Sequence, residues 1–168
     1  MTAQATMRNG PQAEEAGREY LAFSLGGEEY AVNILQVQEI RAYERVTRIA
    51  NMPAFIKGVM NLRGAVVPVV DLRVRFNVGK ADYGSSTIVI VINLGPRTIG
   101  MVVDGVSDVV TLRSSDLRPA PQITGVLTAE YLEGVAILDK RMLIIVDIHG
   151  LMSSKEMGLL ESAAASPA

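Results

Sequence analysis

Few residues of this chain have the types and spacing that catalysis or metal binding requires. The chain contains one histidine, His149, and no cysteine. A Cys–His nucleophilic pair is therefore absent, and a zinc site, which needs three or four nitrogen or sulfur ligands, is not expected. His149 follows a predicted strand beside a glycine, a position typical of a loop or of a helix start. Asp104 and Asp108 lack the further carboxylates that would hold calcium or magnesium.

The glycines and the remaining aspartates fit structural roles better than chemical ones. The fifteen glycines form no phosphate-binding loop and lie where hairpins turn. Asp71 and Asp147 end two similar predicted strands, a pattern that favours helix capping or turn closure over a carboxylate pair in one active site. We therefore predict a protein that is not an enzyme and that uses no cofactor and no metal.

The composition of the chain also limits the class of protein to which it can belong. A chain of 168 residues is long enough for one domain with its own core. A net charge of −2 and only eight aromatic side chains argue against a nucleic-acid-binding protein. No apolar run approaches the ~18 residues that span a bilayer, and residues 1–17 lack the apolar segment of a secretory signal. We expect a soluble cytoplasmic protein without membrane insertion.

Charge is unevenly distributed along the chain. Residues 41–80 carry eight Lys or Arg against two Asp or Glu, whereas residues 1–40 and 81–168 each have a net charge of −4. Such a basic region can steer an acidic partner. A solvated surface without a partner gives the same pattern.

The sequence contains an internal duplication. The stretch Ala54–Leu72 has two apolar runs around an Asn-Leu-Arg-Gly turn, and Tyr131–Ile148 repeats its pattern. At an offset of 76 residues the matching pairs are Gly58/Gly134, Val59/Val135, Leu62/Leu138, Val70/Val146 and Asp71/Asp147. At an offset of 69 the earlier parts match as Leu25/Leu94, Gly26/Gly95, Val37/Val106, Glu39/Asp108 and Ile40/Val109. The longer second copy places an insertion within Val110–Thr128.

Short strands with regular turn signals dominate the predicted secondary structure. Residues 1–18 are expected to be a disordered leader, residues 19–161 the folded domain and residues 162–168 a tail. Two hairpins are predicted, Tyr20–Leu25 with Glu28–Asn33 and Thr87–Leu94 with Thr98–Asp104, and an extended segment is predicted at Ile34–Tyr43. A helical turn capped by Asp71 is predicted at Leu72–Asn77, a loop at 79–86 and a C-terminal helix at about 153–161. We expect two similar β-units sharing a core, with a single ten-stranded sandwich as the alternative.

The segment from Ile34 to Arg41 is the clearest candidate for an exposed surface. Apolar residues at 34 and 40 in both copies place Val37 and Glu39 on the opposite face by the period-2 rule. Val37 is then an exposed apolar residue beside a charge. Because Gln36 and Gln38 break the alternation, the interpretation that Val37 belongs to the core stays open.

Taken in order, several motifs resemble those of the CheW family of bacterial chemotaxis coupling proteins. The motifs are Val37-Gln38-Glu39-Ile40-Arg41, Val46-Thr47-Arg48-Ile49, Pro53-Ala54-Phe55-Ile56-Lys57-Gly58-Val59, Asn61-Leu62-Arg63-Gly64 and Val103-Asp104-Gly105-Val106-Ser107-Asp108-Val109. The resemblance covers about Glu19 to Ser162. It implies two intertwined five-stranded SH3-like β-barrels, the first largely 19–71 and the second largely 87–148, with a short linker helix and a C-terminal helix.

The same resemblance implies a non-catalytic adaptor that joins the cytoplasmic tips of chemoreceptors to the histidine kinase CheA in membrane-associated arrays. The receptor contacts that it implies are Val37, Glu39, Ile40, Lys57, Gly58 and Arg63. In the family, the regulatory domain of the kinase packs on the barrel ends, and here Arg118 and Ile123 are the residues expected to contribute. Self-association within arrays is left open.

Two other functions fit parts of the sequence. One is a docking domain derived from a larger signalling protein, either a coupling-receiver fusion or the regulatory domain of the kinase, although no receiver or ATP-binding pattern is present. The other is a small-ligand-binding, enzyme-like barrel, which a ligand-induced shift in melting temperature would reveal.

Overall fold

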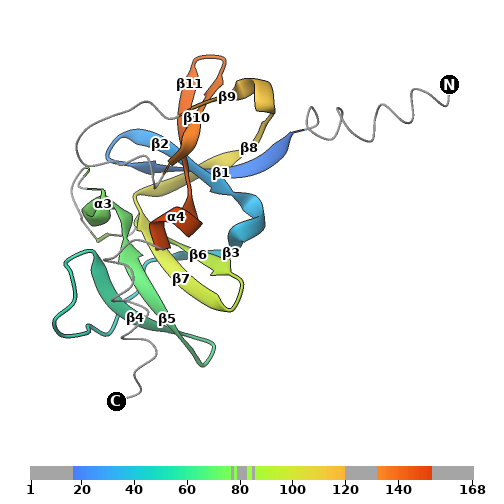
Figure 1. Cartoon of the computed structure of the whole chain (residues 1–168). Helices are drawn as coiled ribbons and strands as arrows, with labels where there is room; N and C mark the ends of the chain where they lie inside the picture. Colours follow the sequence, from blue (N-terminus) through green and yellow to red (C-terminus); the bar gives the residue numbers. More distant parts are fainter. Residues whose placement is uncertain (1–16, 77, 79–82, 85, 120–131, 153–168) are drawn as a thin grey trace, which may run out of the picture.

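The computed structural model describes residues 17–76, 78, 83–84, 86–119 and 132–152. Its strands are β1 (Arg18–Leu25), β2 (Glu28–Asn33), β3 (Val37–Ala42), β4 (Ile56–Leu62), β5 (Ala65–Asp71), β6 (Ile88–Leu94), β7 (Arg97–Val103), β8 (Gly105–Leu112), β9 (Leu117–Arg118), β10 (Leu132–Leu138) and β11 (Arg141–Val146). The helices are α3 (Leu72–Arg75) and α4 (Ile148–Met152), with 3-10 turns η1 (Ile34–Gln36) and η2 (Ser114–Asp116). The predicted mainly β architecture is confirmed (Figure 1).

The strands form two sheets, which we call barrel A and barrel B. Barrel A has the order β8-β1-β2-β11-β10-β9, and barrel B has the order β3-β6-β7-β5-β4. In Figure 1 barrel A lies above barrel B, with α4 between them. Each sheet is curved enough that side chains from strands that are not neighbours in the sheet order come into contact. Arg63 forms an ion pair with Glu39 in barrel B, and Arg141 forms one with Asp108 in barrel A.

The barrels do not follow the expected division into residues 19–71 and 87–148. Barrel A takes its first hairpin, β1–β2, from the first sequence copy and β8, β10 and β11 from the second. Barrel B combines β3, β4 and β5 of the first copy with the hairpin β6–β7 of the second. Sequence similarity identifies which segments are equivalent, but it does not determine which segments pair, so the boundaries drawn along the chain were wrong.

The duplication itself is visible in backbone details. Gly58 and Gly134 both have positive φ, 144° and 159°, and both lie where the pairing register of their hairpins shifts. Asp71 accepts a hydrogen bond from the Arg73 backbone N–H at 2.9 Å, and Asp147 accepts one from Gly150 at 3.0 Å. Both aspartates therefore cap the helix that follows their hairpin, as predicted.

Three hydrophobic clusters stabilise the fold. Barrel A encloses a small cluster that includes Tyr20 and Ala22, and barrel B encloses one of valines and Leu62. A larger central cluster joins the two barrels through side chains such as Phe23 and Phe76. Strand β1 is apolar on both faces because alternate residues point into its own barrel and into the central cluster.

Three further predictions have different outcomes: one is confirmed, one is partly wrong, and one lies outside the described residues. The helical turn after Asp71 is confirmed as α3. The segment Ile34–Tyr43 is not extended throughout, because η1 precedes β3; the Asn33 side chain accepts a hydrogen bond from Leu35 N–H and starts that turn. A helix already begins at Ile148 and includes His149, while the helix predicted at 153–161, the leader up to residue 16 and the tail lie outside the described residues.

Candidate interaction surfaces

Strand β3 lies at one edge of barrel B, and its side chains alternate in the sense opposite to that expected. Val37, Glu39 and Arg41 are half-buried, whereas Gln38, Ile40 and Ala42 are exposed. Val37 packs against the central cluster, so the core interpretation of this residue is correct and the exposed one is wrong. Ile40, expected on the inner face, is 45% exposed. The pairing with β6 shifts register between Val37 and Glu39, an irregularity that the period-2 rule does not anticipate.

This arrangement gives a direct comparison of two substitutions on one strand. Val37→Asp places a carboxylate among apolar side chains of the central cluster and should lower the free energy of unfolding by about 1–3 kcal/mol. Ile40→Asp changes an exposed side chain and should alter it by about 0.5 kcal/mol or less. Urea denaturation followed by circular dichroism measures both. Equal effects of the two substitutions would contradict the orientation of β3.

An ion pair connects β3 to the turn between β4 and β5. Arg63 Nη2 lies 2.6 Å from Glu39 Oε1, and Arg41 Nη1 lies 3.3 Å from Glu39 Oε2. Hydrogen bonds from Arg63 and then Arg41 lower the pKa of Glu39. Arg63 has a φ of 52°, and the neighbouring Asn61 side chain accepts a hydrogen bond from Gly64 N–H at 2.7 Å, which fixes the turn. The pair is held by the turn yet open to solvent, with the Arg63 side chain 64% exposed.

Lys57 and Gly58 occupy different surroundings from that ion pair. The Lys57 ammonium lies 5.2 Å from the centre of the Tyr83 ring, within cation–π range. Gly58 is buried beneath the segment before β4, where Thr47 and Val59 exchange two backbone hydrogen bonds of 2.8 Å. Of the six residues predicted to bind the receptor, the structure therefore brings Glu39 and Arg63 into contact, leaves Ile40 exposed, sets Lys57 over the Tyr83 ring, and gives Val37 and Gly58 packing roles.

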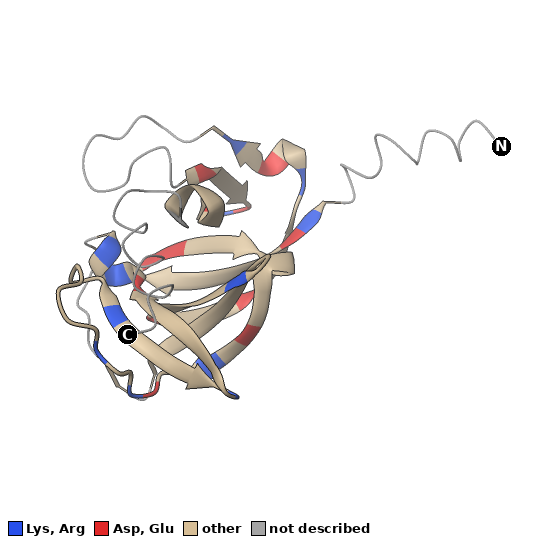
Figure 2. Ribbon diagram, turned by 60° about the horizontal axis from the view of Figure 1, so that its bottom comes forward, with Lys and Arg blue, Asp and Glu red and all other residues tan. Residues whose placement is uncertain are grey.

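Basic side chains surround this part of barrel B. Figure 2 shows Lys and Arg on α3, on β4 and along the loop that leads into β4. Arg45 and Arg48 of that loop are exposed. Part of the positive charge counted in residues 41–80 therefore lies at the surface of barrel B, at residues such as Arg45, Arg48 and Arg63, where it can attract an acidic partner.

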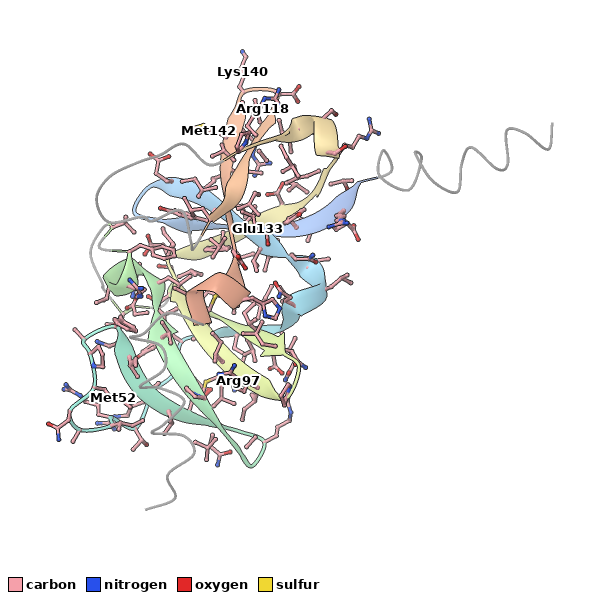
Figure 3. The ribbon with its side chains drawn as sticks, in the orientation of Figure 1. Met52, Arg97, Arg118, Glu133, Lys140 and Met142 are labelled. Carbon is pink, nitrogen blue, oxygen red and sulfur yellow. The ribbon has the colours of Figure 1, made fainter. Side chains whose placement is uncertain are left out.

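A second exposed surface lies at the end of barrel A. Ile137 of β10 and Met142 of β11 face each other across the hairpin, and Met142 is 57% exposed. Arg118 of β9 pairs with Val135, which lies two residues before Ile137 and therefore on the same face. Figure 3 shows Arg118, Lys140 and Met142 together at this end, away from Met52 and Arg97 of the other barrel.

Sequence reasoning identified Arg118 at this surface but missed Ile137 and Met142. Arg118 is exposed, and its Nη1 donates to the Ser115 carbonyl at 2.7 Å and to the Leu117 carbonyl at 3.1 Å, so its guanidinium is oriented by η2 and β9. The two apolar residues could have been found from the turn between them, because residues next to a hairpin tip are poorly covered by neighbouring strands. Ile123 lies outside the described residues.

The described residues were also compared with the requirements of a metal site and of a membrane-spanning helix. Among them no group of three or more His, Asp or Glu side chains is arranged to hold a metal ion. None of the helices in the described ranges is both long and apolar enough to cross a bilayer.

Comparison with known proteins places the chain in a family. Residues 19–156 match the CheW-like domain. The chain is 55% identical over 153 residues to the chemotaxis protein CheW of Klebsiella aerogenes, covering 91% of this chain and 92% of that protein. It is 31% identical over 141 residues to the chemotaxis protein CheW of Bacillus subtilis, covering 84% and 90%. The crystal structure of the scaffolding protein TtCheW from Thermoanaerobacter tengcongensis superposes with a TM-score of 0.77 and 31% identity, covering 83% of this chain and 95% of that one.

These similarities span nearly the whole described fold and agree with its two five-stranded units, to which barrel A adds the two-residue strand β9. The predicted pair of intertwined SH3-like barrels is confirmed. The motifs that suggested the relationship lie in β3, in the loop before β4, in β4, in the turn after β4 and from the end of β7 into β8. The chain belongs to the CheW family of chemotaxis scaffolding proteins.

Proposed function

We propose that this chain is a non-catalytic adaptor that couples the cytoplasmic tips of chemoreceptors to the histidine kinase CheA. Its place in a family of chemotaxis proteins supports the process. The observation that carries the adaptor role is the presence of two separate surfaces, one on each barrel: exposed Ile40 with the Glu39–Arg63 pair on barrel B, and exposed Ile137 and Met142 with Arg118 on barrel A. Two binding surfaces on one rigid fold suit a protein that holds two partners at once.

The receptor-binding surface in this proposal is the β3 edge of barrel B. A receptor tip is a helical hairpin, and a helix can place its apolar side against Ile40 while charged groups at the rim set its orientation. Glu39, Arg63 and Lys57 supply those charges. Val37 and Gly58 contribute from beneath, by fixing β3 on the core and β4 against the preceding loop.

Arg63→Ala should weaken recruitment to receptors without harming the fold. The exposed ion pair with Glu39 contributes only about 0–1 kcal/mol to stability, whereas loss of a guanidinium that orients a partner removes a charged contact worth about 1.5–3 kcal/mol, or roughly 10-fold or more in affinity. Co-sedimentation with receptor-bearing membranes measures the affinity. Lys140→Ala, at the equivalent hairpin of barrel A, is the control and should bind receptors normally. If Arg63→Ala lowered the melting temperature along with receptor affinity, loss of fold would explain the loss of binding, and Arg63 would not be assigned as a receptor contact.

The kinase-binding surface in this proposal is the end of barrel A. Arg118 and Ile123 were the residues expected there, and Ile137 and Met142 extend the surface as exposed apolar groups. A regulatory domain with a similar barrel end can bury these side chains against its own. The arginine, oriented by backbone carbonyls, then lies at the rim of the contact.

Met142→Asp should reduce binding of the kinase regulatory domain and leave receptor binding intact. A carboxylate at a desolvated apolar contact costs about 2 kcal/mol or more, which corresponds to roughly 30-fold in affinity. Isothermal titration with the isolated regulatory domain measures this change. Val66→Asp, on exposed surface of barrel B, is the control. Kinase binding that survives Met142→Asp would exclude this surface.

The adaptor proposal as a whole is tested by reconstitution. Receptor-bearing membranes, the kinase and this chain are mixed, and phosphorylation of the kinase is followed with and without the chain. We expect the chain to be required for control of the kinase by the receptor. Kinase control that is equally strong without the chain would refute the proposal.

A further inference from the structure

The two junctions between the barrels are related by the internal duplication, but their chemistry differs. At the first junction, Arg73 of α3 is almost wholly buried between two aspartates. Its Nε and Nη2 contact the Asp71 carboxylate, each at 3.1 Å, and its Nη1 contacts Asp104 Oδ1 at 3.0 Å. Asp71 also accepts a hydrogen bond from the Tyr83 hydroxyl.

This network reaches from one barrel to the other. Asp71 ends β5 of barrel B, and Asp104 lies on the crossover from β7 of barrel B to β8 of barrel A. Asp104 Oδ2 accepts a hydrogen bond of 2.8 Å from the Gly26 N–H, in the turn between β1 and β2 of barrel A. The Asp104 N–H donates to the Ser24 carbonyl at 3.0 Å. A continuous chain of charged and backbone groups thus connects barrel B to barrel A.

Among the described residues, the equivalent positions at the second junction do not form such a bridge. The offsets of the duplication carry Asp71 to Asp147, Arg73 to His149 and Asp104 to Leu35. Leu35 cannot accept a hydrogen bond through its side chain, and it is 88% exposed. His149 is also exposed, and the Asp147 carboxylate serves the Gly150 N–H of α4. Within the described part of the chain, a buried bridge therefore spans one junction, and the equivalent positions of the other do not form one.

We infer that the Asp71–Arg73–Asp104 bridge is a positioning device that sets the orientation of barrel A relative to barrel B from one side. The central apolar cluster holds the barrels together, but apolar contacts are not directional. A planar guanidinium between two carboxylates is directional, because its donors fix both distance and angle. The unbridged junction, at Leu35 and His149, is where the barrels can move apart when the bridge is lost.

This inference rests on the proposed function for its biological meaning, because the bridge would set the angle between the receptor-binding and kinase-binding surfaces. Arg73 and Asp104 are not among the residues proposed for either surface, although Arg73 and Lys57 both lie over the Tyr83 ring, at 5.0 and 5.2 Å. They are positioning residues. Their loss should change how the two partners bind together more than how each binds alone.

The inter-barrel orientation can be measured without either partner. The chain has no cysteine, so Lys140→Cys and Ala65→Cys introduce two spin labels at exposed positions, one at the tip of each barrel's hairpin. Pulsed electron–electron double resonance gives the distribution of distances between the two spin labels. Asp104→Asn keeps an acceptor for Gly26 and removes the charge that faces Arg73. Asp139→Asn, at an exposed aspartate with positive φ that asparagine also tolerates, is the matched control.

We expect a broader or shifted distance distribution for Asp104→Asn and an unchanged one for Asp139→Asn. Arg73→Lys keeps the charge but cannot bridge two carboxylates with one planar fork, so it should broaden the distribution as well. An unchanged distribution in both bridge variants, with circular dichroism showing native fold, would overturn the inference. If Asp104→Asn does not fold, the result for Arg73→Lys decides, and if neither folds, the bridge is a folding element and the inference fails.

A second measurement connects the bridge to function. With the fold intact, the Asp104→Asn variant should bind the receptor alone, and the kinase regulatory domain alone, with an affinity within about twofold of that of the native chain. Binding of one partner in the presence of the other should weaken by about fivefold or more. Because the spin-label distances require neither partner, a failure of the adaptor proposal and a failure of the bridge give different results.

Discussion

Phe23→Ala should lower the free energy of unfolding by about 3–5 kcal/mol. Phe23 is fully buried in the central cluster, its ring centre is 6.0 Å from that of Tyr30, and Tyr30 is in turn 6.0 Å from Phe76. Removing the ring leaves a cavity where the two barrels meet. Urea denaturation followed by circular dichroism gives the change, and Val66→Ala, an exposed position, should cost about 0.5 kcal/mol or less.

The same substitution tests how strongly the barrels depend on each other. Because the central cluster takes side chains from both, the loss should lower the stability of both together. Hydrogen exchange should then show reduced protection in β10–β11 of barrel A and in β4–β5 of barrel B by similar factors. Reduced protection confined to barrel A, which contains Phe23, would show that the barrels unfold separately.

Gly58→Ala should destabilise the protein by about 3 kcal/mol or more. A Cβ atom at this position would lie 2.0 Å from the Thr47 carbonyl oxygen, and its φ of 144° is unfavourable for alanine. Backbone strain costs about 1–3 kcal/mol, and forcing the loop away from β4 adds an overpacking cost of about 1–3 kcal/mol. The amides of Thr47 and Val59, which bond across this contact, should lose protection from exchange.

Gly64→Ala is the matched control for that prediction. Gly64 also has a positive φ, 92°, but a Cβ there would meet no atom within 4 Å. Its substitution should therefore cost the backbone strain alone. Equal destabilisation by the two substitutions would mean that the Thr47 contact contributes nothing. The comparison also separates folding from binding, because a Gly58 variant that loses receptor binding through loop displacement does not identify Gly58 as a contact residue.

The candidate surfaces were only partly predictable from sequence. The family resemblance predicted both Arg63 and Glu39 as receptor contacts, and the structure places the two side chains in contact with each other. Ile137 and Met142 were not predicted as contact residues, because an apolar residue in a strand is usually a core residue and only the tertiary structure shows that these two side chains are exposed. The faces of β3 were reversed because the 3-10 turn η1 separates Ile34 from the strand, so an alternation counted from Ile34 does not continue into β3.

The sequence by itself determined the class of fold, the duplication and the local devices that end each strand. Alternating apolar residues, glycines at turns and the aspartates Asp71 and Asp147 are read from neighbouring residues, and local geometry follows from them. Only the tertiary structure decided that the first hairpin of each copy pairs with strands of the other. Equivalent strands from the two copies offer similar backbone and apolar faces, so pairing within a copy and pairing between copies satisfy the same local rules. The choice between them depends on long-range packing in the central cluster, which takes side chains from both copies and which no short stretch of sequence contains.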